Sequence, residues 1–305
     1  MTQTSLSPRA WIELALLGFL WGASFLFIRL ALNEYGPFWV VALRTSLAAL
    51  FLWVLAVLRR WPLPSLSDWG ALAVMGVLNN VIPFTLMTWG QQHIETGLTS
   101  ILNAATAVWG VLLAALVFSD ERLTPRKAVG VLLGFVGVAT ATGLGNLARL
   151  EPTSVAQLAV IAGTLSYAFA SIWARRTLGK LKPQVAAMGM LSASSLCAIV
   201  AALALEGVPR WPAMPITWAA IAYMALPATA LAYLLYYRVL ATAGSGNLML
   251  VTLLIPPVAI ILGAVVLGES LSPEAYAGFA LLALGLTILD GRVIERTRSA
   301  SRAPK

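Results

Sequence analysis

The sequence predicts an all-α membrane protein with ten transmembrane helices arranged as two inverted five-helix repeats. Three observations predict it: an apolar composition, ten long apolar runs and an internal repeat. Of the 305 residues, 60% are hydrophobic and only 10% are charged, whereas about 25% of the residues of a soluble domain are charged. A soluble fold of this size has too little interior to bury so many apolar side chains.

The same composition excludes other classes of protein. Disordered chains are polar and rich in charge, and a disulfide scaffold needs more than the single cysteine, Cys197. The net charge of +8 would suit a nucleic-acid-binding protein, but in a membrane protein basic residues mark the cytoplasmic loops. We therefore expect the lipid bilayer and a small-molecule substrate as partners, and no nucleic acid.

A helix needs about 20 apolar residues to cross the hydrocarbon core, and the chain has ten such runs separated by short polar breaks with turn-forming residues. Lipid offers a backbone no hydrogen-bond partner, and the runs lack strict alternation, so each is expected to be a helix. The first run is too long for a signal peptide and shows no clear cleavage site. The expected spans are 11–32, 37–58, 69–89, 97–118, 127–143, 155–177, 184–205, 217–237, 247–267 and 275–290.

Basic residues predict the orientation of these spans. With a cytoplasmic N-terminus, sixteen of the twenty Lys and Arg residues fall in cytoplasmic segments, and only Arg149 and Arg210 fall in outer loops. This is a strong positive-inside bias. Both termini are therefore expected in the cytoplasm.

The chain also repeats itself. Residues 95–125 and 243–273 align without a gap at an offset of 148, and both end in the pattern Glu-x-Leu-x-Pro. Each half has five spans, and because five is odd the second half enters the membrane from the opposite side. The expected units are a first repeat over 1–150, an inverted second repeat over 151–290, and a basic cytoplasmic tail over 291–305.

Inverted repeats are typical of secondary transporters, in which the substrate site lies near the membrane middle and the halves rock to give alternating access. The rival classes are a membrane-embedded enzyme and a scaffold. An enzyme would need a metal cluster, paired carboxylates or a nucleophile with its base, and the chain has one histidine, His93, and neither a zinc-protease motif nor a phosphate loop. No enzyme activity, metal site or cofactor is therefore expected.

Four short motifs mark the first, second, fourth and ninth spans. They are Trp21-Gly22-Ala23-Ser24-Phe25, Leu43-Arg44, Glu121-x-Leu123-x-Pro125 and Glu269-x-Leu271-x-Pro273. With these motifs the chain resembles, over nearly its whole length, the drug/metabolite transporter superfamily in its ten-helix EamA-type branch. The resemblance implies export or exchange of small metabolites across the bacterial inner membrane, and within the branch an exporter of aromatic or hydrophobic amino acids is the best match. A proton-coupled exporter of drugs or other metabolites is the alternative.

Polar and aromatic residues near the middle of the spans are the candidate site. Polar side chains are costly in lipid, so these are expected to face the protein interior. For a single Ser or Thr, hydrogen bonding between helices is the competing interpretation, whereas two adjacent amides beside Pro83 need several partners, which a wet cavity also supplies. The candidate substrate-binding residues are Trp21, Ser24, Asn79, Asn80, Asn103, Trp109, Tyr167, Ser171 and Tyr233.

The expected cavity is lined by aromatic rings and amides and carries no fixed charge. Aromatic faces stack on apolar side chains and attract an ammonium group, while amides and hydroxyls can bind a carboxylate. This suits a zwitterion or a neutral amphipathic solute. It suits a phosphate compound poorly, because phosphates prefer clusters of arginine.

Charged residues within or beside the spans have separate expectations. Arg29 lies near an outer span end and can extend to the surface. Arg44 lies about 10 Å from the outer end of its span, where it either bridges helices through backbone carbonyls or attracts a substrate carboxylate. Glu121 and Glu269 are expected to cap the starts of spans five and ten.

Small residues and prolines predict packing and movement. Gly130, Gly134, Gly137 and Ala141 form one face of span five, which can serve either the interior or a dimer, so a monomer or a weak homodimer is expected. Prolines give spans three, eight and nine places to kink and so to move in gating. The expected gating residues are Pro83, Pro227, Pro256 and Pro257.

Acidic residues bear on energy coupling. Coupled transporters often hold a carboxylate at mid-membrane, but the Asp and Glu residues here lie at span ends or in loops, with Glu13 the nearest to an exception. The expected mechanism is facilitated transport driven by the substrate gradient. Proton coupling through Glu13 is the alternative.

Overall fold

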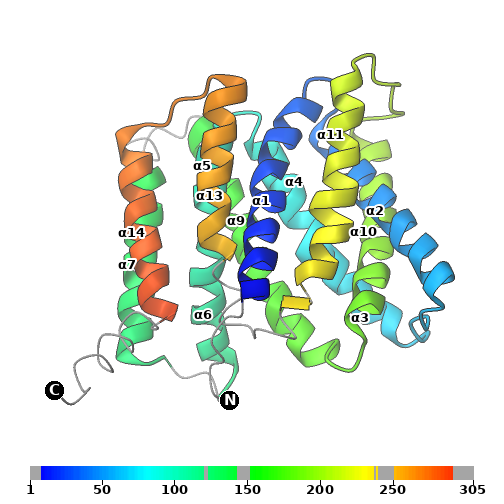
Figure 1. Ribbon diagram of the computed structural model, residues 1–305, viewed down its shortest axis with the longest axis horizontal. Helices are drawn as coiled ribbons and strands as arrows, with labels where there is room; N and C mark the ends of the chain where they lie inside the picture. Colours follow the sequence, from blue (N-terminus) through cyan, green and yellow to red (C-terminus); the bar gives the residue numbers. More distant parts are fainter. Residues whose placement is uncertain (1–7, 120–122, 143–151, 237, 240–250, 291–305) are drawn as a thin grey trace.

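The structure, a computed structural model, describes residues 8–119, 123–142, 152–236, 238–239 and 251–290, and within these ranges every regular element is a helix. The helices form ten rods that stand side by side (Figure 1). The predicted fold class, an all-α membrane protein of two inverted five-helix repeats, is confirmed.

The first five rods belong to the first repeat. They are α1 (Pro8–Ala31), α2 (Pro37–Arg59), α3–η1–α4 (Asp68–Gly76, Val77–Val81 and Ile82–Gly90), α5–α6 (Thr96–Asn103 and Ala105–Val117) and α7 (Pro125–Thr142).

The other five rods belong to the second repeat. They are α9 (Pro152–Thr177), α10 (Pro183–Leu205), α11–η2 (Pro215–Ala225 and Leu226–Leu231, continuing as helix to Tyr236), α13–η3 (Val251–Leu262 and Gly263–Leu267) and α14 (Pro273–Asp290).

Local sequence explains where these rods begin and why they suit a membrane. Many begin with proline, which has no N–H to leave unpaired and a φ angle already suited to a helix. Seven of the described rods are long and apolar enough to cross a bilayer, and Leu254–Leu267 and Pro273–Leu289 form shorter apolar helices. Large apolar side chains such as Leu50, Leu132 and Leu196 are more than half exposed, as expected where lipid replaces water.

The packing of the rods shows the inverted symmetry. The closest pairs join the repeats: α7 packs on α14, α2 on α10, α1 on α13, and α4 on α9. Each rod of the first repeat has its counterpart five rods later in the second repeat. The pairs α7–α14 and α2–α10 therefore join counterparts. The pair α1–α13 has its own counterpart in the contact of α9 with α5 and α6, which the structure also shows. The core is therefore an interface between the two repeats.

Glycines allow α7 and α14 to pack in close contact. From the sequence, the glycine stripe of span five could serve either an interior contact or a dimer. A Cβ atom on Gly137 would lie 2.8 Å from the carbonyl oxygen of Gly278, and one on Gly130 would lie 2.8 Å from that of Gly285. Gly130 and Gly137 correspond to Gly278 and Gly285 in the repeat. The stripe therefore serves an interior contact between the repeats.

Carboxylates from one repeat cap helices of the other. Glu206 at the end of α10 accepts hydrogen bonds from the backbone N–H groups of Phe38 and Trp39 at the start of α2, both at 3.0 Å. Glu269 accepts from the backbone N–H of Thr96 at 2.9 Å and from its hydroxyl at 2.8 Å. Such carboxylates also interact favourably with the helix dipole.

The expectation that Glu269 caps the start of span ten is therefore wrong. It caps α5 of the other repeat, while the hydroxyl of Ser272 accepts from the N–H of Ala275 at 3.2 Å at the start of α14. The sequence points to the local helix, but the nearest free N–H groups belong to a helix more than 170 residues away in the chain. Glu121, expected to act in the same way, lies outside the described residues.

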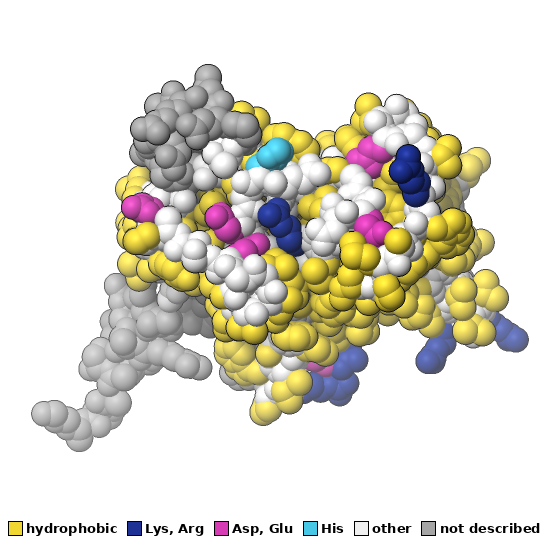
Figure 2. Space-filling view, turned by 90° about the horizontal axis from the view of Figure 1, so that it is seen from above, with side chains coloured by type: hydrophobic (Ala, Val, Ile, Leu, Met, Phe, Trp, Pro, Cys, Tyr) yellow, Lys and Arg dark blue, Asp and Glu magenta, His cyan; other side chains and the backbone are white. Residues whose placement is uncertain are grey.

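Charge differs between the two ends of the bundle. The start of α1 and the end of α14 lie at the same end (Figure 1), and the described basic residues of the helix ends and loops on that side include Arg59, Arg175 and Lys182. The opposite end is shown in Figure 2, with acidic side chains on both sides of a basic side chain near its middle. Near that end, Arg29 donates to the carbonyl oxygen of Gln91 instead of extending freely to the surface.

Candidate functional site

Both repeats carry a π-helical segment at equivalent positions. η1 interrupts the third rod and η2 interrupts the eighth. Each begins two residues after a methionine, Met75 or Met224, and these two methionines match when the repeat offset of 148 is shifted by one residue to 149. A π-helical turn changes the backbone hydrogen-bond pattern, and such turns frequently occur at functional sites. The prolines expected to kink these rods lie within or beside these turns, at Pro227 in η2 and at Pro83 just after η1.

The two π-helical regions meet through a chain of side-chain hydrogen bonds. The hydroxyl of Tyr233, two residues after η2, accepts from Asn79 Nδ2 at 2.8 Å and donates to Asn80 Oδ1 at 2.8 Å. Asn80 Nδ2 then donates to the hydroxyl of Ser194 in α10 at 2.8 Å. Asn80 is 0% exposed, whereas Asn79 is half-buried. Asn80 therefore positions Tyr233. The amide oxygen of Asn79 has no hydrogen-bond partner among the described residues and can accept from another group.

Backbone carbonyls of both π-helical segments accept hydrogen bonds from the first helix of each repeat. Trp21 Nε1 in α1 donates to the carbonyl oxygen of Ala228 at 3.2 Å. In the other repeat, the hydroxyl of Ser166 in α9 donates to the carbonyl oxygen of Leu78 at 2.7 Å. The two contacts are counterparts in the two repeats. Polar groups from both halves therefore meet in one layer, which contains Trp21, Asn79, Asn80, Ser166 and Tyr233 and the backbone of η1 and η2.

Arg44 brings a cation into this layer, which the sequence analysis expected to carry no fixed charge. Its Nε donates to the hydroxyl of Thr229 at 2.7 Å, and its Nη2 lies 3.4 Å from the carbonyl oxygen of Ala228. The guanidinium carbon lies 4.0 Å from the centre of the Phe84 ring, a cation–π distance. Arg44 thus bridges α2 to η2, the first of its two expected roles.

Aromatic rings surround these polar groups. Trp21 lies 5.9 Å from Tyr236, and Phe27 stacks on Tyr223 at 4.1 Å, both measured between ring centres. The Tyr167 ring lies edge-on to that of Phe84 at 6.5 Å. These rings lie on helices of both repeats, around Arg44 and Trp21.

Other candidate residues lie apart from this layer. The hydroxyl of Ser24 donates to the carbonyl oxygen of Trp21 in its own helix. Asn103 ends α5, and Trp109 packs edge-on against Phe135 of α7 at 4.6 Å. The indole N–H of Trp109 is buried with no acceptor among the described residues, so it can donate to a ligand or to water.

Ser171 does not face the interior. It is exposed on α9, and its hydroxyl donates to the carbonyl oxygen of Ala168 at 2.7 Å. In the sequence Ser171 follows Tyr167 by four residues, and residues four apart lie on the same side of a helix. Four residues turn a helix by about 400°, and the extra 40° carries Ser171 beyond the edge of the buried face of α9.

Sequence reasoning missed Ser194 and Ser166 as members of the layer, and it placed Thr229 at the middle of span eight without including it in the candidate site. One signal was available, because extending the match of Met75 with Met224 aligns Asn80 with Thr229. The two are equivalent polar residues in the two π-helical segments. No signal in the sequence identifies Ser194, because its contact depends on how α10 packs against η1.

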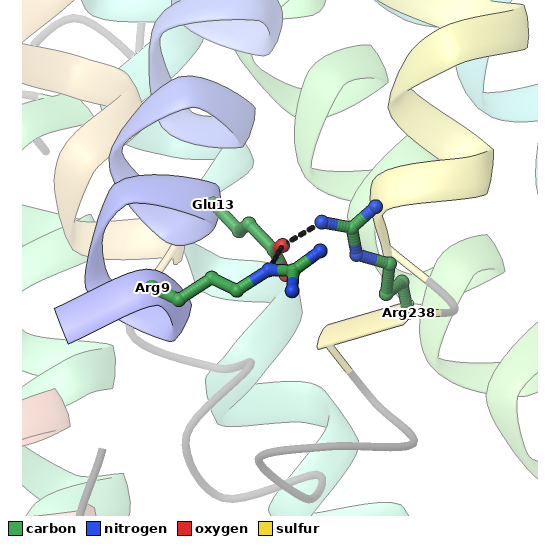
Figure 3. A network of polar contacts seen from close by, with 3 residues as sticks. All are labelled: Arg9, Glu13 and Arg238. Atoms are coloured by element: carbon green, nitrogen blue, oxygen red, sulfur yellow. Dashed lines mark hydrogen bonds and ion pairs between the residues drawn. The ribbon is translucent and has the colours of Figure 1, made fainter. Parts of the chain in front are cut away.

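An ion-pair network lies nearer the end of the bundle where α1 begins (Figure 3). Arg9 Nε lies 3.2 Å from Glu13 Oε1, and Arg238, which follows the rod that contains η2 in the chain, contacts the same carboxylate oxygen. The Glu13 side chain is 9% exposed, against 77% for Arg9 and 49% for Arg238. The network joins the first helix of the first repeat to Arg238 of the second repeat.

The fold and the site together define a multi-pass membrane carrier built from inverted repeats. The profile of the EamA-like transporter family matches this chain twice, over residues 9–143 and 154–289. The chain belongs to that family. It is a transporter rather than an enzyme, it is embedded in a membrane, and its substrate is a small molecule.

Similar proteins that are described as transporters agree with this assignment. A "Probable terminal-alkyne amino-acid exporter" of Streptantibioticus cattleyicolor is 28% identical over 97% of this chain and 98% of that protein. A "Probable amino-acid metabolite efflux pump" of Salmonella typhimurium is 27% identical over 92% of this chain and 95% of that protein. The "Uncharacterized inner membrane transporter YedA" of Escherichia coli is 22% identical over 88% of this chain.

A solved crystal structure also resembles the fold. It superposes with a TM-score of 0.64 at 19% sequence identity, covering 92% of this chain and 96% of that chain. At this identity the likeness supports the fold alone.

Proposed function

We propose that this protein exports amino acids with hydrophobic or aromatic side chains by alternating access. The observation that carries the proposal is the layer of amides, hydroxyls and aromatic rings in which the two π-helical regions meet. Such a layer offers stacking surfaces for an apolar side chain and hydrogen bonds for the polar end of an amino acid. The names of two relatives, an amino-acid exporter and an amino-acid metabolite efflux pump, point to the same class of substrate.

The proposed site consists of Asn79, Tyr233, Trp21 and Tyr167, with Asn80 positioning Tyr233. Asn103 and Trp109 extend the site towards α7, where the Trp109 indole N–H, which has no acceptor in the described part of the chain, provides a donor. Ser24 supports the site through the backbone of α1, and Ser171 is left out because it is exposed.

Gating is proposed to occur in the rods that contain Pro83, Pro227, Pro256 and Pro257. Two of these rods carry η1 and η2, and α13, with both remaining prolines, is followed by η3. By contrast, α7 and α14 are held together by backbone contacts at their glycines. We therefore expect α7 and α14 to act as a rigid support while the proline-containing rods move.

The proposed orientation places both termini in the cytoplasm of a bacterium, with the transporter in the inner membrane. The ion-pair network of Arg9, Glu13 and Arg238 then lies on the cytoplasmic side and closes that side by joining the two repeats. The two arginines stay with Glu13 as ionic partners, which supports facilitated transport. Proton coupling through Glu13 is the second candidate, and electrogenic uptake that disappears only in Glu13→Gln would establish it.

Uptake into proteoliposomes tests the function directly. Purified protein is supplied with labelled amino acids, amines, nucleobases and sugar nucleotides in turn. Saturable uptake of leucine or phenylalanine, in preference to phosphate compounds, is the expected result. Movement of none of these solutes in either direction, or preference for a sugar nucleotide, contradicts the proposal.

A further inference from the structure

Arg44 is a buried cation that lacks an anionic partner. The residue is 6% exposed, and it lies about 10 Å along α2 from the outer helix end. Burying an arginine away from water costs several kcal/mol unless an anion compensates. Among the described residues, Arg44 forms no ion pair: its polar contacts are the hydroxyl of Thr229 and the carbonyl oxygen of Ala228.

The contacts of Arg44 occupy one side of its guanidinium group. A guanidinium has five N–H groups in a planar fork, and here Nε binds Thr229 while Nη2 makes one long contact. The two N–H groups of Nη1 have no acceptor in the described part of the chain. The edge formed by Nη1 and Nη2 is therefore available for two parallel hydrogen bonds, as a carboxylate forms with arginine.

The repeat shows that bridging the helices does not require a positive charge. Both α2 and α10 begin with proline and have 23 residues, and aligning them places Met190 at the position of Arg44. Met190 also reaches the π-helical segment of the opposite repeat, where Asn79 Nδ2 donates to its sulfur at 3.5 Å. A neutral side chain thus performs the bridging role in one repeat. The charge in the other repeat needs a separate explanation.

The surroundings of Arg44 restrict the ligand to a small monoanion with an apolar body. Phe84 covers one face of the guanidinium, and Tyr167, Tyr223 and Tyr233 lie close enough to interact with its charge. A phosphate dianion is better matched by several basic groups, and no second basic side chain contacts this layer among the described residues. Aromatic rings beside a single guanidinium instead suit a carboxylate that carries a hydrocarbon group.

We propose that Arg44 binds the carboxylate of the transported solute through its Nη1–Nη2 edge, with Thr229 holding Nε in place. This inference rests on the proposed function and deepens it, because it makes a free carboxylate a requirement for transport. Amino acids and simple aryl or alkyl carboxylic acids are then substrates or competitors. The matching amides and decarboxylated amines are not.

The wild-type protein provides the first test. Proteoliposomes take up labelled L-phenylalanine in the presence of unlabelled phenylalanine, phenylalaninamide or phenethylamine, which share one aromatic ring and differ at the carboxylate. Phenylalanine is expected to compete, whereas the amide and the amine should need about 10- to 100-fold higher concentrations because they lose a charged hydrogen-bond pair. Equal competition by all three compounds overturns the proposal for Arg44 but leaves amino-acid transport intact.

Variants of Arg44 provide the second test. Arg44→Lys keeps the charge but loses the planar fork, so the KM for phenylalanine is expected to rise about 10-fold or more while kcat changes less. Arg44→Gln should abolish the preference for phenylalanine over its amide. Arg59→Gln is the matched control, because Arg59 ends the same helix and is exposed.

The outcomes separate the two proposals. Circular dichroism confirms that each variant is folded, and the wild-type competition series remains decisive if a variant is not. An unchanged KM and unchanged selectivity in folded Arg44→Gln overturn the carboxylate site. Failure of the wild-type protein to move any amino acid instead overturns the proposed function on which the site depends.

Discussion

The contact between α7 and α14 predicts that one added methyl group destabilises the protein. A Cβ atom on residue 137 would lie 2.5 Å from the backbone nitrogen of Leu282 and 2.8 Å from the carbonyl oxygen of Gly278. Both neighbours are backbone atoms, so they cannot turn away as a flexible side chain can. In Gly137→Ala the two helices must therefore separate.

The size of the effect follows from these distances. Ordinary carbon contacts begin near 3.4 Å, so the helices must move apart locally by about 1 Å, which loosens a close-packed interface. Forcing an extra methyl group into a packed interior typically costs about 1–3 kcal/mol. Gly278→Ala meets the backbone nitrogen of Ala141 at 2.4 Å, and one separation relieves both clashes. The double variant should therefore lose less than the sum of the two single losses.

Unfolding of the purified protein in detergent, followed by circular dichroism, measures this effect. Gly110→Ala is the control, because a Cβ atom on Gly110 in α6 would have nothing within 4 Å. The control should be neutral or slightly stabilised, since alanine favours a helix over glycine. If Gly137→Ala unfolds at the wild-type midpoint, or if Gly110→Ala loses as much stability, the close contact between α7 and α14 is wrong.

Three further predictions concern the site and the ends of the bundle. Asn80→Ala removes the acceptor of the Tyr233 hydroxyl and the amide that donates to Ser194, so uptake of phenylalanine should fall by about tenfold or more with a normal amount of protein in the membrane; an unchanged rate would remove the amide layer from the site. Glu13→Gln weakens the ion-pair network at the end where α1 begins and removes the carboxylate that proton coupling would need. Because facilitated transport needs no proton site, proteoliposome uptake by the wild-type protein and by Glu13→Gln should both be independent of an imposed pH gradient. A proton-driven component that the wild-type protein has and Glu13→Gln loses would show coupling through Glu13. A hydrogen bond from the Thr217 hydroxyl, helped by backbone N–H groups, lowers the pKa of Glu34 from its ordinary value of 4.5. The contribution of Glu34 to stability is then complete above pH 4.5 and is lost as the pH falls through the lowered pKa. Below about pH 4.5, the melting temperature of Glu34→Gln should therefore depend less on pH than that of the wild-type protein. Identical pH profiles would contradict this prediction.

Much of the fold could be predicted because it depends on regular patterns in the sequence. Apolar runs of about 20 residues and a gapless repeat at an offset of 148 identify the rods and their inversion. The glycine stripe of span five was also visible, but the sequence alone could not decide whether it served α14 or a dimer. That choice depends on which helix lies opposite, and periodicity within one helix contains no such information.

The site was predicted less completely, for physical reasons that individual residues illustrate. Asn79, Asn80 and Tyr233 were identified from depth and polarity, and hydrogen bonds join them. The π-helical turns that bring them together depend on backbone hydrogen bonding, which side-chain patterns do not specify. Glu269 was assigned to the local helix because its partner, Thr96, is distant in the chain and near only in the folded protein.

Counterflow in proteoliposomes tests the central claim, that a single substrate site between the two repeats is exposed alternately to each side. Vesicles containing wild-type protein are loaded with unlabelled phenylalanine and diluted into labelled phenylalanine. An alternating-access carrier should accumulate label transiently above the outside concentration, and folded Asn80→Ala should show little of this overshoot. Absence of the overshoot in the wild-type protein, with label only equilibrating or not entering at all, would contradict the account.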